Sequence, residues 1–90
     1  MVEVYDKTSR EILLFLLKNS GESINKMSLL LQKTYKQTHD TVNYLEKEGL
    51  IKTERGRRNR RLALTEKGRE VATLFERIDA LLKKEVSENV

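Results

Sequence analysis

Apolar residues recur at three- and four-residue steps in the first fifth of the chain, a spacing typical of an amphipathic helix. Its broad apolar face comprises Ile12, Leu13, Phe15, Leu16 and Leu17. Thr8 and Glu11 have the spacing of a capping box, which predicts that the helix begins at Thr8. Gly21 is the expected stop, because glycine tolerates the left-handed conformation that ends many helices.

Two further helices follow in the pattern. A short one is predicted over about residues 25–33, with Asn25 as its N-cap. Its expected inward-facing residues are Met27, Leu30 and Leu31. Thr34 and Gln37 form a second capping box, which predicts a third helix over residues 35–48.

After Gly49 the period changes from helix to strand. The segments 50–55 and 60–65 are short, and in the second of them Leu62 and Leu64 alternate with more polar residues. The four residues Gly56-Arg57-Arg58-Asn59 lie between these segments. We therefore expect two antiparallel strands joined by a loop.

A long last helix is predicted over about residues 66–86, with Thr65 as its N-cap. Its apolar stripe is Val71, Leu74, Phe75, Ile78, Leu81 and Leu82. Such a helix is roughly 30 Å long, more than so small a domain covers, so only its first half (Val71, Leu74, Phe75) is expected to pack on the domain. For the rest we expect an antiparallel contact with a second copy; the alternative is a helix folded back on its own monomer. The expected dimer residues are Phe75, Ile78, Leu81, Leu82 and Val86.

The element order is thus helix, helix, helix, hairpin, long helix. It predicts a mainly α chain of the α+β class: a winged helix-turn-helix with three helices, a two-stranded β-hairpin wing and a long C-terminal helix. We expect residues 1–65 to form a DNA-binding domain and residues 66–90 a dimerisation helix continuous with it.

Residues 34–68 resemble the MarR-type winged-helix regulators. The stretch Tyr44-Leu45-Glu46-Lys47-Glu48-Gly49-Leu50-Ile51 resembles the family's end of recognition helix and start of wing. The stretch Arg60-Arg61-Leu62-Ala63-Leu64-Thr65-Glu66-Lys67-Gly68 resembles its return strand and following helix. The resemblance extends over roughly residues 8–75 and implies DNA binding and transcription regulation.

The chain departs from the MarR pattern in two respects. Asn59 stands where an acidic residue usually precedes the paired arginines of the wing. MarR proteins are also longer, with extra terminal helices that form the dimer and often an effector pocket; in this chain no small-molecule effector is evident. At 90 residues the chain is also similar to small archaeal winged-helix chromatin and viral proteins that dimerise through a C-terminal helix.

The positive charge is concentrated in one segment. Residues 1–51 carry seven Lys or Arg and seven Asp or Glu, whereas residues 52–70 carry eight against three. The remaining residues, 71–90, carry three against four. A basic segment in an otherwise balanced chain is typical of a polyanion-binding surface.

The third helix is the predicted reader of the DNA major groove. At 100° per residue, Thr38, Val42, Leu45 and Gly49 share one face, which we expect to be buried. The residues expected on or beside the opposite, DNA-reading face are Tyr35, Lys36, Gln37, His39, Asp40, Asn43, Tyr44 and Lys47. Lys36 and Gln37 suit base edges or phosphates, and Asn43 suits adenine. The alternative is a solvated helix face, with His39 an ordinary surface imidazole.

The predicted wing is rich in arginine. Its expected contacts to the DNA backbone or minor groove are Arg55, Arg57, Arg58, Asn59, Arg60 and Arg61. Like charges this close repel unless an anion lies between them, and the guanidinium fork matches phosphate. The alternatives are a solvated turn or a surface for an acidic protein or lipid.

Several classes of protein are disfavoured. The chain has no cysteine and one histidine, so we expect no structural zinc and no other metal or cofactor. No nucleophile is paired with a base and no glycine loop could hold a phosphate, so we expect no enzyme. The longest apolar run, Ile12 to Leu17, is too short for a membrane span, and no basic leader precedes it. We expect a protein of the cytoplasm, associated with the nucleoid.

Together these patterns favour a homodimeric, sequence-specific regulator that binds double-stranded DNA. The first alternative is an architectural protein that coats DNA with little sequence preference. The second is a winged helix used only for protein interaction, which the clustered arginines disfavour.

Overall fold

The computed structural model describes the backbone of residues 6–55 and 60–88 and the side chains of residues 6–54 and 60–83. In chain order its elements are α1 (Lys7–Lys18), β1 (Glu22–Ser23), α2 (Ile24–Leu31), α3 (Tyr35–Lys47), β2 (Ile51–Arg55), β3 (Arg60–Leu64) and α4 (Glu66–Glu88). This order confirms the predicted winged helix-turn-helix, with its hairpin and long last helix.

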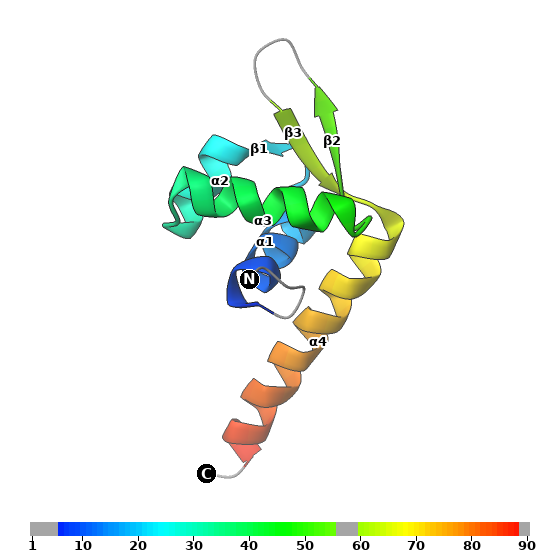
Figure 1. Ribbon diagram of the computed structural model, residues 1–90. Helices are drawn as coiled ribbons and strands as arrows, with labels where there is room; N and C mark the ends of the chain where they lie inside the picture. The colour runs from blue at the N-terminus through cyan, green and yellow to red at the C-terminus, as the bar shows by residue number, and fades with distance from the viewer. Residues whose placement is uncertain (1–5, 56–59, 89–90) are drawn as a thin grey trace.

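The molecule is elongated, with extents of 51 × 26 × 25 Å. In Figure 1 the strands stand at the top, α2 and α3 lie beneath them, and α1 lies below α3. The helix α4 begins at the base of the hairpin and passes along α1, and its last turns extend beyond the other elements toward the C-terminus (Figure 1). The length of the molecule is therefore largely the length of α4.

The sheet has three antiparallel strands in the order β1-β3-β2, one more than the predicted hairpin. In the pair of β2 with β3, Ile51 lies opposite Leu64 and Arg55 opposite Arg60, as expected of the hairpin. The added strand β1 pairs Glu22 with Leu62. It has two residues, too few to produce an alternating pattern in the sequence.

Gly21 serves this added strand rather than the end of α1. The first helix ends at Lys18, and Asn19 caps it by donating from both its backbone and side-chain nitrogens to the Phe15 carbonyl. Gly21 has a φ of +88° and donates its N–H to the Leu62 carbonyl at 2.8 Å. Its left-handed conformation therefore turns the chain into the sheet.

The hydrophobic core lies where α1, α2, α3 and the inner face of the sheet meet. Its buried members are Ile12, Leu13, Leu16, Ile24, Met27, Val42, Leu45, Leu50, Ile51, Leu62, Leu64 and Ala72. The apolar face expected of the first helix supplies three of them, and the alternating pair Leu62 and Leu64 is buried as predicted. The first part of α4 closes the core through Ala72.

The predicted start of the first helix is wrong. The helix begins at Lys7 after Asp6, so Thr8 lies inside it and forms no capping box. Glu11 instead forms an ion pair with Lys33 at 3.0 Å, and the Thr8 hydroxyl accepts from Gln37 Nε2 at 3.4 Å. Thr8 and Glu11 therefore do not cap the helix as their spacing predicted. Each contacts a residue distant in sequence, Gln37 in α3 and Lys33 in the turn before α3.

The second helix is also displaced from its prediction. Its N-cap is Ser23, whose hydroxyl accepts from the Lys26 N–H, so Asn25 is not the cap. Ile24 and Met27 are buried, whereas Leu30, expected inside, is 56% exposed. Once the helix begins at Ile24, the spacing of 24, 27, 28 and 31 defines its inner face, and residue 30 falls outside that face.

The caps predicted for the last two helices are confirmed. The Thr34 hydroxyl accepts from the Gln37 N–H at 3.1 Å, although the Gln37 side chain does not complete the box. The Thr65 hydroxyl accepts from the Gly68 N–H at 3.0 Å. The helix α3 ends at Lys47 with Glu48 as its C-cap, and Gly49 after it has a φ of +77°, the left-handed conformation that glycine adopts at helix ends.

Candidate nucleic-acid interface

The buried side of α3 fixes which of its residues face outward. Thr38, Thr41, Val42 and Leu45 are buried. The opposite side is polar and exposed, as predicted, and holds Lys36, Asp40, Asn43 and Lys47. Gly49, expected on the buried face, lies beyond the end of the helix and is exposed. A helix that packs on its domain through one face and exposes a polar opposite face can enter the major groove of DNA.

Two residues expected on the flanks of this exposed face are engaged elsewhere. Gln37 is exposed, but its side-chain amide nitrogen contacts Thr8 of α1. Tyr44 is half-buried and packs against the core. Their positions make both less available to a ligand in front of α3 than the helical wheel alone indicated.

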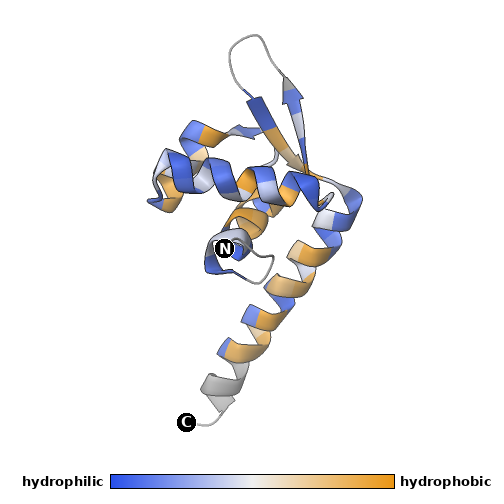
Figure 2. Cartoon of the chain, in the orientation of Figure 1, coloured by the Kyte–Doolittle hydropathy of each residue, from blue (hydrophilic) through white to orange (hydrophobic). Residues whose placement is uncertain are grey.

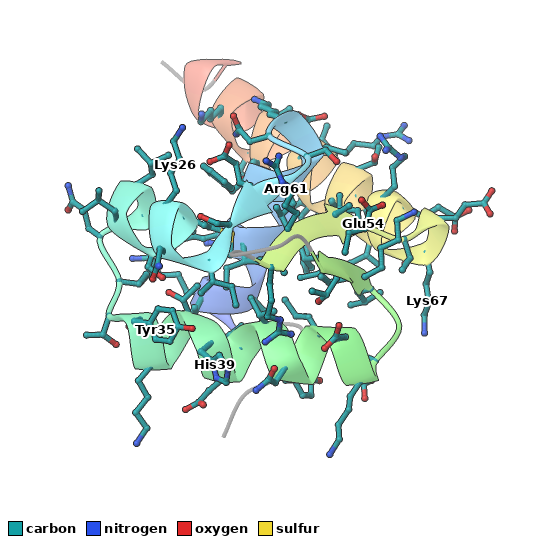
Figure 3. The ribbon with its side chains drawn as sticks, turned by 90° about the horizontal axis from the view of Figure 1, so that it is seen from above. Lys26, Tyr35, His39, Glu54, Arg61 and Lys67 are labelled. Carbon is teal, nitrogen blue, oxygen red and sulfur yellow. The ribbon has the colours of Figure 1, made fainter. Side chains whose placement is uncertain are left out.

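Three polar side chains form a row along α3. The Tyr35 ring stacks on the His39 ring, with centroids 5.7 Å apart and planes at 26° (Figure 3). His39 Nδ1 lies 3.3 Å from Asn43 Nδ2 and 3.9 Å from an Asp40 carboxylate oxygen. The histidine is therefore half-buried within its neighbours rather than an isolated surface imidazole, and it constrains the amide expected to read a base.

The tip of the predicted wing, Gly56, Arg57, Arg58 and Asn59, lies outside the described residues, as does the Arg55 side chain. Arg60 and Arg61 begin β3, and successive residues of a strand face opposite sides of the sheet. The Arg60 guanidinium lies on the side of α3, where its Nη2 contacts Glu46 Oε1 at 3.5 Å and Thr53 Oγ1 at 3.4 Å.

Arg61 lies on the other side of the sheet. It is exposed and pairs across the strands with Glu54 in β2 and Ser23 in β1. Figure 3 shows Arg61 and Glu54 on neighbouring strands, with Lys26 of α2 on the same side of the molecule. Arg61 and Lys26 line a small hollow of about 150 Å³ beside β1. The two arginines expected to act together are thus separated by the sheet.

The distal part of α4 carries apolar side chains that the chain does not cover. Leu74, Ile78, Leu81 and Leu82 are 59%, 49%, 59% and 55% exposed. Figure 2 shows hydrophobic positions continuing along α4 beyond the other elements. Val71 and Phe75 pack on the core as expected, but Leu74 does not. At 100° per residue Leu74 shares the face of Ile78 and Leu81, not that of Phe75. Val86 lies beyond the described side chains.

A groove of about 540 Å³ lies between α1 and α4. Its apolar lining is Leu14, Phe15, Leu31 and Ala80, and charged residues of both signs, such as Lys18 and Glu76, lie at its edge. Lys18 Nζ lies 3.9 Å from Glu76 Oε2, and this ion pair connects the two helices.

Within the described residues no group of three or more His, Cys, Asp or Glu side chains could hold a metal ion. No helix in this part of the chain is long and apolar enough to cross a membrane.

A family model described as HVO_A0114 matches residues 4–67. That segment extends from just before α1 to the first turn of α4 and contains α3 and both strands of the hairpin. No curated protein matches the chain.

Solved structures of transcription regulators have the same fold. The Staphylococcus aureus regulator MepR is 20% identical over 90% of this chain, with a TM-score of 0.79, and the chain spans 63% of the length of MepR. FabT of Streptococcus pneumoniae, solved in complex with DNA, is 21% identical over 97% of this chain and 67% of its own, with a TM-score of 0.79.

A shorter protein, F-93 of SSV1, matches over almost its whole length. It is 23% identical and has a TM-score of 0.70, with 93% of this chain and 98% of F-93 aligned. A MarR transcriptional regulator from Methanosarcina mazei also matches, at 23% identity and a TM-score of 0.80 over 88% of this chain and 54% of that protein. The resemblance to MarR-type winged helices is thereby confirmed for the fold.

Proposed function

The chain belongs to the HVO_A0114 family, and from this membership and its winged-helix fold we propose that it is a DNA-binding transcription regulator that acts as a homodimer. In this proposal α3 lies in the major groove of a preferred, pseudo-palindromic site. The arginine-rich segment 55–61 lies along the minor groove or the backbone. The protein then acts in the cytoplasm, on the DNA of the nucleoid.

The observation that carries the proposal is the placement of α3. Its inner face is fixed by buried Thr38, Val42 and Leu45, while Lys36 and Asn43 stand exposed on the outer face. A rigid mounting matters because base readout requires side chains held in register with the base edges. The solved FabT complex supports the proposal, since a protein of the same fold binds DNA.

The composition of the hairpin supports a backbone contact beside that helix. Five arginines lie within residues 55–61, and no acidic residue lies among them. The strand β2 leaves the core at Ile51, β3 returns to it at Leu64, and the two strands pair with each other from Ile51–Leu64 to Arg55–Arg60. Phosphates of a bound duplex would relieve the repulsion among these charges, which a neutral protein surface would not.

The distal half of α4 supports the dimer. The exposed residues Leu74, Ile78 and Leu81 continue one helix face, and that face points away from the core. Apolar stripes of this kind are typical of helices that pair with another helix. A two-fold pair would present two α3 helices to successive major grooves, about 34 Å apart.

Binding to two kinds of duplex across a salt series tests the proposal. A duplex selected from a random pool should bind at least about a thousandfold more tightly than a scrambled one. Near-equal affinities that fall steeply with salt would instead indicate an architectural protein that contacts the backbone. Binding to neither duplex would contradict DNA binding and favour a protein-interaction role.

Two variants separate base readout from backbone contact in that experiment. Asn43→Ala should cost about 1–3 kcal/mol on the selected duplex and little on the scrambled one. The matched control, Arg57→Ala with Arg58→Ala, should weaken binding to both duplexes and flatten the salt dependence. Equal losses on both duplexes for Asn43→Ala would contradict a role of Asn43 in reading bases.

A further inference from the structure

A polar cluster connects the end of α3 to the base of the hairpin. Glu46 of α3 accepts a hydrogen bond from the Thr53 hydroxyl of β2 at 2.6 Å through Oε2. Its other oxygen, Oε1, accepts from Arg60 Nη2 of β3 at 3.5 Å. The same guanidinium nitrogen also donates to Thr53 Oγ1 at 3.4 Å. We call Glu46, Thr53 and Arg60 the hairpin clamp.

Each member of the hairpin clamp contacts both of the others. The side chains of Arg60 and Glu46 are 35% and 38% exposed, so water competes with their contact only in part. The shared Thr53 hydroxyl adds one contact to each of the two charged side chains, so three contacts rather than one connect the members of the clamp. The clamp therefore holds three elements, α3, β2 and β3, at one point.

The position of that point gives it a functional consequence. Glu46 is one residue from Lys47 and three from Asn43, both on the exposed face of α3. Arg60 is the first described residue after the arginine-rich tip. The clamp lies between the surface proposed to enter the major groove and the segment proposed to lie beside it. The angle between these two parts decides whether both can contact one duplex.

We propose that Arg60 is a positioning residue: Glu46 and Thr53 hold its guanidinium, which orients the hairpin relative to α3, and it does not contact DNA phosphates itself. This inference rests on the proposed function. The sequence pattern predicted that Arg60, like Arg61 and the tip arginines, contacts DNA. The inference replaces that prediction for Arg60. Only Arg61, on the other face of β3, keeps an uncommitted charge among the described wing arginines.

The salt dependence of DNA binding distinguishes a positioning residue from a phosphate contact. Each phosphate contact that is lost should reduce the slope of log K against log salt by about 0.9. Arg61→Gln, the matched control one residue away, is expected to reduce the slope by that amount. Arg60→Gln is expected to weaken binding about threefold to tenfold at every salt concentration and to leave the slope unchanged.

Variants of the partners give the second signature. Glu46→Gln should weaken DNA binding as much as Arg60→Gln, and the double variant should lose no more than either single one, since both act through one contact. Thr53→Val keeps the shape of the side chain and the charges of Glu46 and Arg60. If the other variants unfold, this one should still show a loss of DNA affinity, smaller than the loss expected of them. A reduction of the slope by Arg60→Gln equal to that by Arg61→Gln would overturn the proposal.

A measurement without DNA tests the clamp apart from the proposed function. In a ¹⁵N NMR spectrum of the unbound protein, the Arg60 guanidinium signal should shift in Glu46→Gln and stay in place in the control Glu54→Gln. An unmoved Arg60 signal in Glu46→Gln would overturn the clamp even if the wild-type protein binds DNA. If the NMR shift is present but the wild-type protein binds no duplex, the contact between Glu46 and Arg60 stands. The proposed function and the role of the clamp in DNA binding would then be overturned.

Discussion

The winged-helix part of the chain and the distal half of α4 have the same amphipathic spacing but opposite environments. In the first, Ile12, Leu16 and Leu45 lie on helix faces that the core buries almost completely. In the second, Ile78 and Leu81 lie on an equally regular face that remains about half exposed. Helical periodicity thus identifies a face that needs a partner, but it does not say whether that partner lies within the same chain.

The reason for the difference is the place of each helix in the fold. Each of the first three helices packs against at least three other elements, whereas α4 packs against α1 and β3 and then extends past them (Figure 1). An exposed row of large apolar side chains costs free energy in water and is relieved by association. The comparison predicts that variants in the first region change folding, and variants in the second change self-association.

The largest effect is expected inside the core. Leu45→Ala removes a side chain with no exposed surface and should lower the free energy of unfolding by about 2–5 kcal/mol. Chemical denaturation at two protein concentrations measures it. The loss should be the same at both, because this contact lies within one chain. A loss below about 1 kcal/mol would contradict the buried position of Leu45.

A smaller loss of stability is expected where the two regions join. A Cβ added to Gly68 would lie 1.9 Å from the Leu50 carbonyl oxygen, a backbone atom that cannot turn aside. Gly68→Ala should therefore destabilise the fold by about 3 kcal/mol, the upper end for overpacking. Thr73→Ala, at an exposed position of the same helix, is the control for thermal denaturation. Equal melting temperatures for the two variants would mean that α4 is not seated against Leu50.

The distal region should respond through self-association. Ile78→Glu with Leu81→Glu places charges on the exposed apolar face and should weaken dimerisation by about ten- to a hundredfold. Sedimentation over a range of concentrations measures the change, and circular dichroism checks that the helices remain. Thr73→Glu adds the same charge at an exposed position of α4 outside the row of Ile78 and Leu81 and serves as control. An unchanged dimer in the double variant would break the comparison.

The smallest effect is expected from the ion pair between α1 and α4. Lys18 and Glu76 are 3.9 Å apart with side chains 73% and 49% exposed, so water and salt screen them. Glu76→Gln should change the free energy of unfolding by no more than about 0.5 kcal/mol. Urea denaturation resolves that limit. A loss above about 1 kcal/mol would show that this surface contact, and not only the core, holds α4 in place.

Features with local causes could be predicted from the sequence. The N-caps Thr34 and Thr65 were identified because a hydroxyl reaching an N–H three residues later depends only on its own turn. The strand pattern of Leu62 and Leu64 followed from alternation, and the outer face of α3 from its period. Each of these signals lies within one helix, with its cap, or within one strand.

Features that depend on distant partners could not be predicted in this way. The pair Thr8 and Glu11 has the spacing of a capping box, but the partners of these residues are Gln37 and Lys33. Likewise, no spacing rule links Glu46 to Arg60, which meet only when α3 packs on the sheet. A cluster of arginines in the sequence indicates excess charge, and the fold decides which of them is already paired.

The central claim is that two copies, joined through α4, place two α3 helices on one face of a duplex. The most direct measurement is the binding of the selected duplex and of a version with five base pairs inserted between its half-sites, with stoichiometry from sedimentation. The account predicts two protomers per duplex and a large loss of affinity on insertion, because half a helical turn moves one half-site to the opposite face of the duplex. Half-sites that fill independently of each other, with no effect of the insertion on affinity, would contradict it.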